Sequence, residues 1–550
     1  MFLALRRSRP HVFGVALLFA AASACTSQPA LRDPLDELGT HHRAVTTASA
    51  EAQAWFDRGL VLTYAFNHDE AVRCFEKALA ADPRCASAWW GIALCNGPHI
   101  NFPFVDDVHG ERAWKALEKA RELAPGASSV EQALIAALGR RYAWPNPADR
   151  RALDEAYANA MREVWRAYPK DPDVGALCAE ALMDLSPWNQ WTRAGQPKPG
   201  TLEVLQALDD VIALDPRHPL AHHLKIHALE ASHAPDQANA SAEILRTLVP
   251  GAGHLVHMPA HIDSRVGRWH EASTANERAA EVDARYRALH TEQGFYRVYM
   301  AHNRHFLAFS CMMEGRSADA LAAARALIAE MPEDWARENA LFVDGFLAID
   351  LEVLLRFGRW DEILAQPEPP EWLPVKRALH HFARGAAYAA LRKPDKARTE
   401  ERELARAGEL VPKEATIGNN SAHAALAIAA KVLAGEIAAA GRDWNAAVNA
   451  LERAVELEDQ LAYDEPPDWI MPVRHSLGAV LLRDGRFEAA EKVYREDLRW
   501  YPENGWSLRG LATSLRGQNR TEEANSVEER FRIAWQHADI DIASSCLCQP

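Results

Sequence analysis

Seven histidines and one glutamate fall in three short blocks of the sequence. Within each block the residues are three or four positions apart, and on an α-helix this spacing places side chains on one face. The blocks are His223, His227 and Glu230; His254, His257 and His261; and His302 and His305.

Imidazole and carboxylate groups at this spacing are typical of a transition-metal site. Neutral imidazole is a common ligand of Zn, Cu, Fe and Ni, and a carboxylate such as Glu230 completes many such sites. Eight candidate ligands exceed the four that a structural zinc ion needs, so the surplus favours a dinuclear centre, a catalytic histidine or outer partners of the ligands. We therefore expect bound Cu, Zn or Fe. Because no Walker loop or dinucleotide glycine pattern is present, we expect no nucleotide cofactor.

A metal-free interpretation stands beside this one. Histidines on one surface can hydrogen-bond to one another, to Asn303 and to water, and for a single pair of histidines that reading is preferred. Three blocks in successive repeats favour the metal. Pro259 complicates the middle block, because proline inside a helix removes a hydrogen bond. If the helix instead starts at Pro259, His254 leaves the face, and His257 and His261 remain.

A repeated helix pair must position the three blocks. Trp89 follows Trp55 by 34 residues, the period of the tetratricopeptide (TPR) repeat, and small residues recur where paired helices would approach closely. The composition is 48% apolar, without strand-like alternation. The sequence predicts an all-α, TPR-type helical-repeat solenoid wound as a right-handed superhelix. A Gly-Arg turn recurs before second helices, at 267–268, 315–316, 358–359 and 485–486.

The repeat register places the three blocks on one surface. In TPR proteins, positions 2, 5, 9, 12 and 13 of the first helix line the concave face. Seven of the fifteen such positions in three successive repeats are histidine, whereas 23 histidines in 550 residues predict fewer than one. The register was set by Ala, Gly and Pro, so this agreement is independent of the histidines. First helices of neighbouring repeats lie about 8–10 Å apart, so these side chains can share one ion or two adjacent ions.

A second set of residues is expected in the ligand groove. The aromatic and proline-rich segment 463–469 precedes Arg474 and His475, and it either overhangs the groove or serves as a rigid connector between repeats. The candidates for groove contacts are Asn303, Arg265, Arg474, His475 and Trp469.

The N-terminus has the features of an export signal. A basic start and an apolar run over 12–22 precede Ala-Ser-Ala-Cys, which predicts a lipoprotein signal peptide over 1–24 and lipidation of Cys25. Thr26, rather than Asp, follows the cysteine, and by resemblance to bacterial lipoproteins this favours the outer membrane. We expect a flexible tether over 25–45 and a location in the bacterial cell envelope, lipid-anchored on the periplasmic face of the outer membrane.

Charge restricts the partners of the remaining chain. Asp and Glu outnumber Lys and Arg by 76 to 61, which argues against nucleic acid or anionic lipid. We expect a protein, peptide or small-molecule ligand in the concave groove, and membrane contact only through the lipid anchor. Cys74, Cys85 and Cys95 are near enough in the repeat to form a disulfide, with buried free thiols as the alternative.

The expected domains are an N-terminal TPR array with the histidine-rich concave face over 46–340, a C-terminal TPR array over 341–536 and a tail over 537–550. Residues from about 45 to 535 resemble a group of bacterial TPR-repeat proteins through three blocks. These are Phe-Asn-His-Asp-Glu-Ala at 66–71, His-Met-Pro-Ala-His at 257–261 and His-Asn-Arg-His-Phe at 302–306. The resemblance implies the fold and assigns no activity.

Two hypotheses of function follow. The first is an envelope protein whose histidine cluster holds a transition metal for catalysis or metal handling. The second is a metal-free scaffold that docks a partner protein. No catalytic signature assigns an enzyme activity, and histidine in place of the Asn, Lys and Arg of peptide-docking grooves favours the first.

Overall fold

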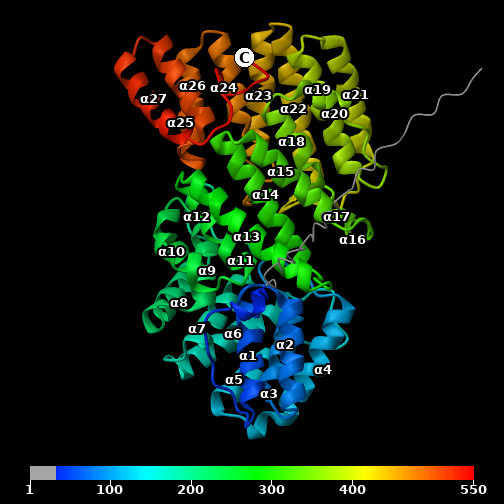
Figure 1. Cartoon of the computed structure of the whole chain (residues 1–550), viewed down its shortest axis with the longest axis vertical. Coiled ribbons are helices and arrows are strands. Elements are labelled where there is room, and N and C mark those ends of the chain that lie inside the picture. Colours follow the sequence, from blue (N-terminus) through cyan, green and yellow to red (C-terminus); the bar gives the residue numbers. More distant parts are fainter. Residues whose placement is uncertain (1–31, 550) are drawn as a thin grey trace, which may run out of the picture. The chain divides into compact units, whose positions relative to one another are not determined.

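The computed structural model describes residues 32–549, and residues from Asp33 onward form one compact unit. The predicted signal peptide and Cys25 lie outside the described residues. Helices dominate, and the described strands are the short pair β1 (Thr416–Ile417) and β2 (Asn420–Ser421). Each helix packs mainly on its neighbours in sequence, in a continuous array of helix pairs (Figure 1). The all-α helical-repeat prediction is confirmed.

The first part of the array carries the first block of histidines. Its helices are α1 (Ala50–Tyr64), α2 (His68–Ala81), α3 (Ala86–Cys95), α4 (Asp107–Leu123), α5 (Ser129–Leu138), α6 (Arg151–Ala167), α7 (Pro172–Met183), α8 (Thr201–Leu214), α9 (Pro219–Leu229) and α10 (Asn239–Leu248). Short 3-10 helices lie at Pro34–Asp36, Ala124–Gly126 and Pro235–Ala238.

The middle of the array carries the other two blocks. Its helices are α11 (Gly253–His257), α12 (Pro259–Arg265), α13 (Trp269–Leu289), α14 (Tyr296–Glu314) and α15 (Ser317–Glu330).

The last part completes the array. Its helices are α16 (Glu333–Glu338), α17 (Ala340–Val343), α18 (Ile349–Arg356), α19 (Trp360–Ala365), α20 (Pro374–Ala390), α21 (Pro394–Glu409), α22 (Ala422–Ala440), α23 (Trp444–Glu458), α24 (Val473–Arg483), α25 (Phe487–Trp500), α26 (Gly505–Gly517) and α27 (Thr521–Ala534), with a 3-10 helix at Phe346–Ala348.

The turn between paired helices has one recurring backbone geometry. All four glycines of the predicted Gly-Arg turns have a positive φ, between 62° and 83°. Each lies two residues before the second helix of its pair. Phe66, Arg392, Arg442 and Asn519 occupy the equivalent position in other pairs, with φ between 57° and 62°. The left-handed region costs a residue with a side chain about 1–2 kcal/mol, so glycine is the relaxed choice here.

Buried apolar residues form two clusters along the array. The first runs from Leu35 to Met300 and the second from Ala260 to Ile542. They overlap in sequence over 260–300, in the helices that carry the second and third histidine blocks, and the predicted boundary at residue 340 lies inside the second cluster. The second and third histidine blocks therefore lie on helices where the two cores adjoin, and the first block lies within the first cluster.

Part of the predicted tether is not a tether in the structure. Leu35 and Leu38 are buried, the backbone of Gly251 donates to the carbonyl of Glu37 at 2.8 Å, and the Arg43 side chain is buried against Asp171 and Asp173. Buried apolar and paired charged side chains hold residues 33–45 on the array, so the prediction of flexibility is corrected for them.

Two further features bear on the sequence predictions. Cys74, Cys85 and Cys95 are buried free thiols, and a disulfide instead joins Cys546 to Cys548 in the tail. Among the described residues, α22 has the length and apolar composition of a membrane span, with a mean hydropathy of 1.4. It packs on α20, α21 and α23, as a core helix does.

The turn geometry predicts the effect of one substitution. A Cβ at Gly485, whose φ is +75°, would meet no atom within 4 Å, so Gly485→Ala tests the backbone alone. We expect the free energy of unfolding to fall by about 1 kcal/mol, because alanine disfavours the left-handed region. Urea unfolding followed by circular dichroism measures it. Gly408→Ala is the control, since Gly408 lies in α21 without positive φ and its Cβ would come no nearer than 3.9 Å to a neighbour. An equal loss in both variants would contradict the explanation.

Candidate metal centre

Four helices bring six of the seven predicted histidines together. His223 and His227 lie on α9, His254 and His257 on α11, and His261 and His302 on α12 and α14. Helix α9 contacts α12, and α11 contacts both α12 and α14, so the predicted convergence of the blocks is realised. The six form two sets of three, with the ligand atoms of each set within 4.8 Å of one another: His223, His227 and His254; and His257, His261 and His302.

In the first set the imidazole Nε2 atoms face one another. His223 Nε2 lies 3.2 Å from His227 Nε2 and 3.1 Å from His254 Nε2. The other nitrogen of His223, Nδ1, lies 2.8 Å from the backbone carbonyl of Tyr64 at the end of α1. A carbonyl only accepts hydrogen bonds, so Nδ1 carries the proton and Nε2 presents a lone pair.

The second set has the same arrangement. His257 Nε2 lies 2.8 Å from His261 Nε2 and 3.1 Å from His302 Nε2. His257 Nδ1 lies 2.7 Å from the side-chain oxygen of Asn276, whose amide nitrogen donates to the Ala272 carbonyl at 2.9 Å. That second bond fixes the orientation of the amide, so His257 also donates from Nδ1 and presents its lone pair from Nε2.

Glu230 links the two sets. Its Oε1 lies 2.9 Å from His227 Nδ1 and its Oε2 lies 2.5 Å from His261 Nδ1. Burial opposes ionisation of this carboxyl, but His261 and His227 outweigh burial and hold its pKa at about 2. The ionised carboxylate therefore accepts a hydrogen bond from each Nδ1–H group. Glu230 is thus an outer partner of two histidines rather than a ligand beside them, and such partners orient metal ligands.

These Nδ1 contacts leave two pairs of nitrogens without a proton between them. His223 faces His227, and His257 faces His261, each through unprotonated Nε2 atoms at 2.8–3.2 Å. Facing lone pairs repel unless a cation, a metal ion or a proton, lies between them. Burial lowers the pKa of His223 and His257 well below the usual range, which disfavours a proton on these two imidazoles. Three nitrogens around a tetrahedral ion at 2.0–2.1 Å are about 3.3 Å apart. Two of the three distances in each set, 2.8–3.2 Å, are close to this spacing, and the third is within 4.8 Å.

A nearby polar cluster shows the opposite pattern. His41 and His218 both contact Asp173 through Nε2, at 3.0 and 3.1 Å. His218 Nδ1 accepts from the backbone of Ala221, so its Nε2 carries the proton and donates it to Asp173. The Tyr64 hydroxyl donates to the same carboxylate at 2.6 Å. The ligand atoms of His41, Asp173 and His218 also lie within 4.8 Å of one another, but here a carboxylate accepts from the Tyr64 hydroxyl and from His218.

Two aromatic residues in unusual backbone geometry cover the first set. The Phe66 ring lies 4.4 Å from that of His223, and the Trp188 ring lies 5.3 Å from that of His227, between ring centres. Both residues have φ of 57°, which is uncommon for a bulky side chain. Such outliers concentrate at functional sites, and here they place apolar rings over the imidazoles.

Pro259 does not displace His254. Met258, between α11 and α12, has the right-handed helical conformation, and its N–H bonds to the His254 carbonyl at 3.1 Å. The chain therefore continues its helical course through Pro259, and His254 shares the face with His257 and His261. A separate helix, α12, does begin at Pro259, but His254 is not displaced by it and stays beside His223 and His227.

Two other predicted residues lie apart from the sets. His305 is buried with its ring 5.1 Å from that of Phe346, because three positions after His302 the helix turns it toward the following repeat. The Asn303 amide donates to Asp283 at 2.7 Å, inside the contact between α13 and α14. Neither reaches the two histidine sets or the groove.

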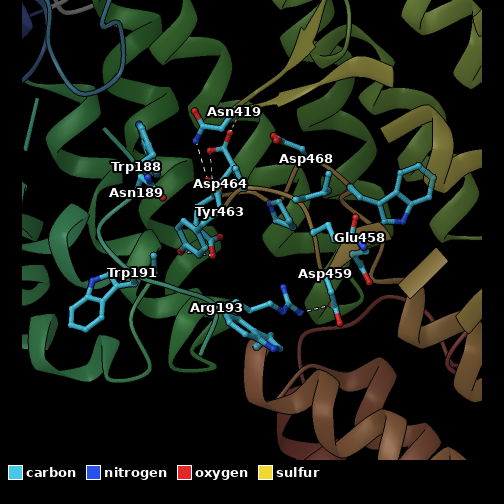
Figure 2. Close-up of a pocket in the computed structure, with 18 of the residues that line it drawn as sticks. Trp188, Asn189, Trp191, Arg193, Asn419, Glu458, Asp459, Tyr463, Asp464 and Asp468 are labelled. Atoms are coloured by element: carbon cyan, nitrogen blue, oxygen red, sulfur yellow. Dashed lines mark hydrogen bonds and ion pairs between the residues drawn. The ribbon is translucent and has the colours of Figure 1, made fainter. Parts of the chain in front are cut away.

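A cavity of about 570 Å³ adjoins the centre (Figure 2). Arg265, Arg474 and Trp469 line it, as does most of the segment 463–469. This segment also connects α23 to α24, so the structure is compatible with both interpretations of it. His475 does not line this cavity. It is buried between Arg356 and Asp497, at 2.8 and 2.9 Å.

Sequence reasoning missed several residues that build the site. Asn276 lies on a second helix, and Tyr64 acts through its backbone, so neither carried a signal. Trp188 follows α7 in a loop that has no repeat register. Phe66 could have been found, because it begins one of the three blocks shared with the bacterial group.

Comparisons with known proteins support the repeat. The tetratricopeptide repeat family matches residues 52–85, which span α1, α2 and the turn between them. No curated protein matches the chain. Solved structures with some similarity include a human IFIT1 dimer with PPP-AAAA (14% identity, 87% of this chain and 89% of that one, TM-score 0.32) and yeast Tom70 (13%, 88% and 90%, TM-score 0.27). The APC/C hetero-tetramer Cut9-Hcn1 matches at 14% identity over 90% and 75% of the chains, with a TM-score of 0.29. Scores this low carry no weight for ligand or function.

The position of Phe66 allows a direct test of its role. Phe66→Gly relieves a left-handed backbone, worth about 1–2 kcal/mol, but removes a buried ring, worth about 3–5 kcal/mol. We expect a net loss of about 2 kcal/mol in the free energy of unfolding, measured by urea denaturation. Arg442→Gly is the matched control, because Arg442 occupies the same turn position and is exposed. It should be neutral or stabilising, and a gain in both variants would show that the Phe66 ring contributes nothing.

Proposed function

We propose that this TPR-repeat protein holds a dinuclear transition-metal centre, with three histidine Nε2 ligands for each ion. The supporting observation is the pair of facing Nε2 lone pairs whose Nδ1 protons are fixed by acceptors. Imidazole-only ligand sets suit Cu, Zn or Fe. A bound ion of this kind supplies Lewis-acid or redox chemistry.

The chain's own groups would do three things at such a centre. Tyr64, Asn276 and Glu230 fix the tautomers, so that the ligand atoms are set before an ion arrives. Phe66 and Trp188 exclude water from the first set. Glu230 makes the two sets one unit, because a single carboxylate holds a histidine of each.

The location is also a proposal, supported by the sequence alone. Export by the signal peptide and lipidation at Cys25 would place the centre in the cell envelope. A small-molecule or peptide ligand would then reach it from the adjoining cavity, and the function would be metal-dependent catalysis or metal handling.

Metal content tests the proposal directly. We expect the full chain, purified without a histidine tag, to contain two equivalents of transition metal by plasma mass spectrometry. The double variant His223→Gln/His227→Gln should lose one equivalent, and His257→Gln/His261→Gln should lose the other. His222→Gln is the matched control, because His222 is a buried histidine of the same helix that is bonded to Ser241 and to the Pro216 carbonyl.

Unchanged metal in both double variants, or equal loss in the control, would overturn the metal centre. Capture of a partner protein that survives both double substitutions and chelation would then favour the docking scaffold.

Metal removal should also lower stability. Without an ion the facing lone pairs repel, and a ligand that binds only the folded state at a thousandfold excess over its Kd contributes about 4 kcal/mol. We expect a chelator to lower the thermal midpoint of the native chain, with recovery on adding Zn²⁺ or Cu²⁺. A chain that carries both double substitutions should not respond to chelator. A response that persists in that variant would place the stabilising ion elsewhere.

A further inference from the structure

The cavity beside the histidine sets has two facing walls. One is the loop of Trp188, Trp191 and Arg193 after α7, and the other is the segment from Glu458 to Trp469 (Figure 2). Arg265 closes the side toward the metal centre, since its Nε donates to the backbone carbonyl of Glu230 at 2.9 Å. Trp188 contacts both the cavity and His227. Through Arg265 and Trp188, the cavity therefore adjoins the histidine sets.

The basic groups of the lining are already occupied. Arg474 pairs with Asp459 at 2.7 and 2.9 Å, and Arg193 also pairs with Asp459. Arg265 donates to three backbone carbonyls, and the Lys198 ammonium donates to Asn189. Arg474 and Arg193 are already neutralised by Asp459, which disfavours phosphate or carboxylate ligands beside them, whereas the Lys198 ammonium makes one contact, with a neutral amide.

The acidic groups of the lining are in excess. Six carboxyls and four basic groups line the cavity. Burial raises the pKa of four of these carboxyls, those of Glu458, Asp464, Glu465 and Asp468, so a cation beside them would favour their ionised forms. The segment 463–469 carries three of these carboxyls. Asp464 and Asp468 are hydrogen-bonded to each other and to backbone or amide groups of Asn419 and Asn420. Neither carboxyl forms an ion pair with a cation among the described residues.

Glu465 provides an independent sign of a missing partner. Its side chain is 3% exposed, and Oε2 has no hydrogen-bond partner among the described residues. Oε1 accepts from the Tyr463 hydroxyl at 3.0 Å. Burial raises the pKa of this carboxyl to about 8, with only partial relief from Arg265. A buried, half-partnered carboxyl beside a cavity would be stabilised in its ionised form by a positive charge.

Aromatic rings supply the rest of the lining. They are Trp188, Trp191, Tyr463, Trp469, Trp500 and Tyr501. Aromatic faces attract cations, most strongly when water is excluded, and rings combined with a carboxylate are typical of ammonium recognition. Arg193 and Arg265 already lie over the Trp500 ring, at 4.5 and 5.4 Å, so these rings accept cationic groups within this chain.

We propose that this cavity binds an organic cation, an ammonium group on an apolar body, with Glu465 facing the charge and the aromatic rings around the body. The binding site does not depend on the metal, although its place behind the histidine sets makes it the entry for a substrate of the proposed centre. Occupied basic groups, unbalanced acids and aromatic walls all favour a positive ligand over a neutral or negative one.

Three probes of one shape and different charge test this. n-Butylammonium, n-butanol and n-butyrate are titrated into the full chain and followed by tryptophan fluorescence and calorimetry. We expect n-butylammonium to bind at least tenfold more tightly than n-butanol, and n-butyrate to show no binding. Equal binding of n-butanol, or tighter binding of n-butyrate, would overturn the proposal, as would preferential binding of a neutral sugar such as glucose.

Matched variants locate the site. Glu465→Gln keeps the shape and removes the charge, and it should weaken n-butylammonium at least tenfold without changing n-butanol. Glu352→Gln is the control, because Glu352 is a carboxyl that does not line the cavity, with a pKa that burial raises to about 8. Equal effects in both variants, or no effect in Glu465→Gln, would overturn the assignment.

Measuring metal content and n-butylammonium binding on the same samples distinguishes a failure of the metal centre from a failure of the cation site. His223→Gln/His227→Gln should keep n-butylammonium binding even where metal is lost. If this variant loses metal and still binds n-butylammonium, both proposals stand. If the unsubstituted chain holds metal but does not bind n-butylammonium, only the cation site is contradicted. If it binds n-butylammonium but never holds metal, only the metal centre is contradicted.

Discussion

The site depends on where four imidazole protons lie. Each of the four histidines at the facing contacts donates from Nδ1, to a carbonyl, an amide oxygen or Glu230, and this leaves Nε2 atoms opposed at 2.8–3.2 Å. The partners come from different places: the end of α1, helix α13 and the end of α9. The packing of several repeats therefore holds the lone pairs together, and no single helix could do so. The same packing explains why the sets lie where the two apolar clusters adjoin.

The turn at Phe66 departs from the repeat pattern beside the candidate site. Eight helix pairs use the same left-handed turn position, and glycine fills it in four of them. Arg392, Arg442 and Asn519 are polar exceptions. Phe66 is aromatic, and its ring lies near the rings of all three histidines of the first set. The backbone at this position favours glycine, yet the residue is a phenylalanine whose ring packs on the histidines. Local conflict of this kind is expected at functional sites.

The sequence was sufficient for the fold and for most of the candidate ligands. Periodicity found the helix pairs, and the spacing within blocks put six histidines on facing surfaces, because both follow from helix geometry. The sequence could not show that the candidate ligands form two sets or that Glu230 lies between them, since both depend on distances between helices. His305 was included for its spacing, yet one turn position on α14 sends it to Phe346. Asn276 and the Tyr64 carbonyl act through tertiary contacts that no local pattern encodes.

The two halves of the site have separate acidic groups. The six imidazoles would be neutral ligands in the proposed centre, and Glu230 is the carboxylate in contact with them. Two divalent ions would therefore carry more positive charge than their immediate surroundings offset. The nearest surplus of acid lies in the cavity wall, where carboxyls outnumber basic groups by two and where burial leaves Glu465 half-partnered. Arg265, which donates to the Glu230 backbone carbonyl, lies between that wall and the histidine sets. The cation proposed for the cavity and the ions proposed for the histidine sets would therefore rely on different carboxyls, Glu465 and Glu230, so that either could bind without the other.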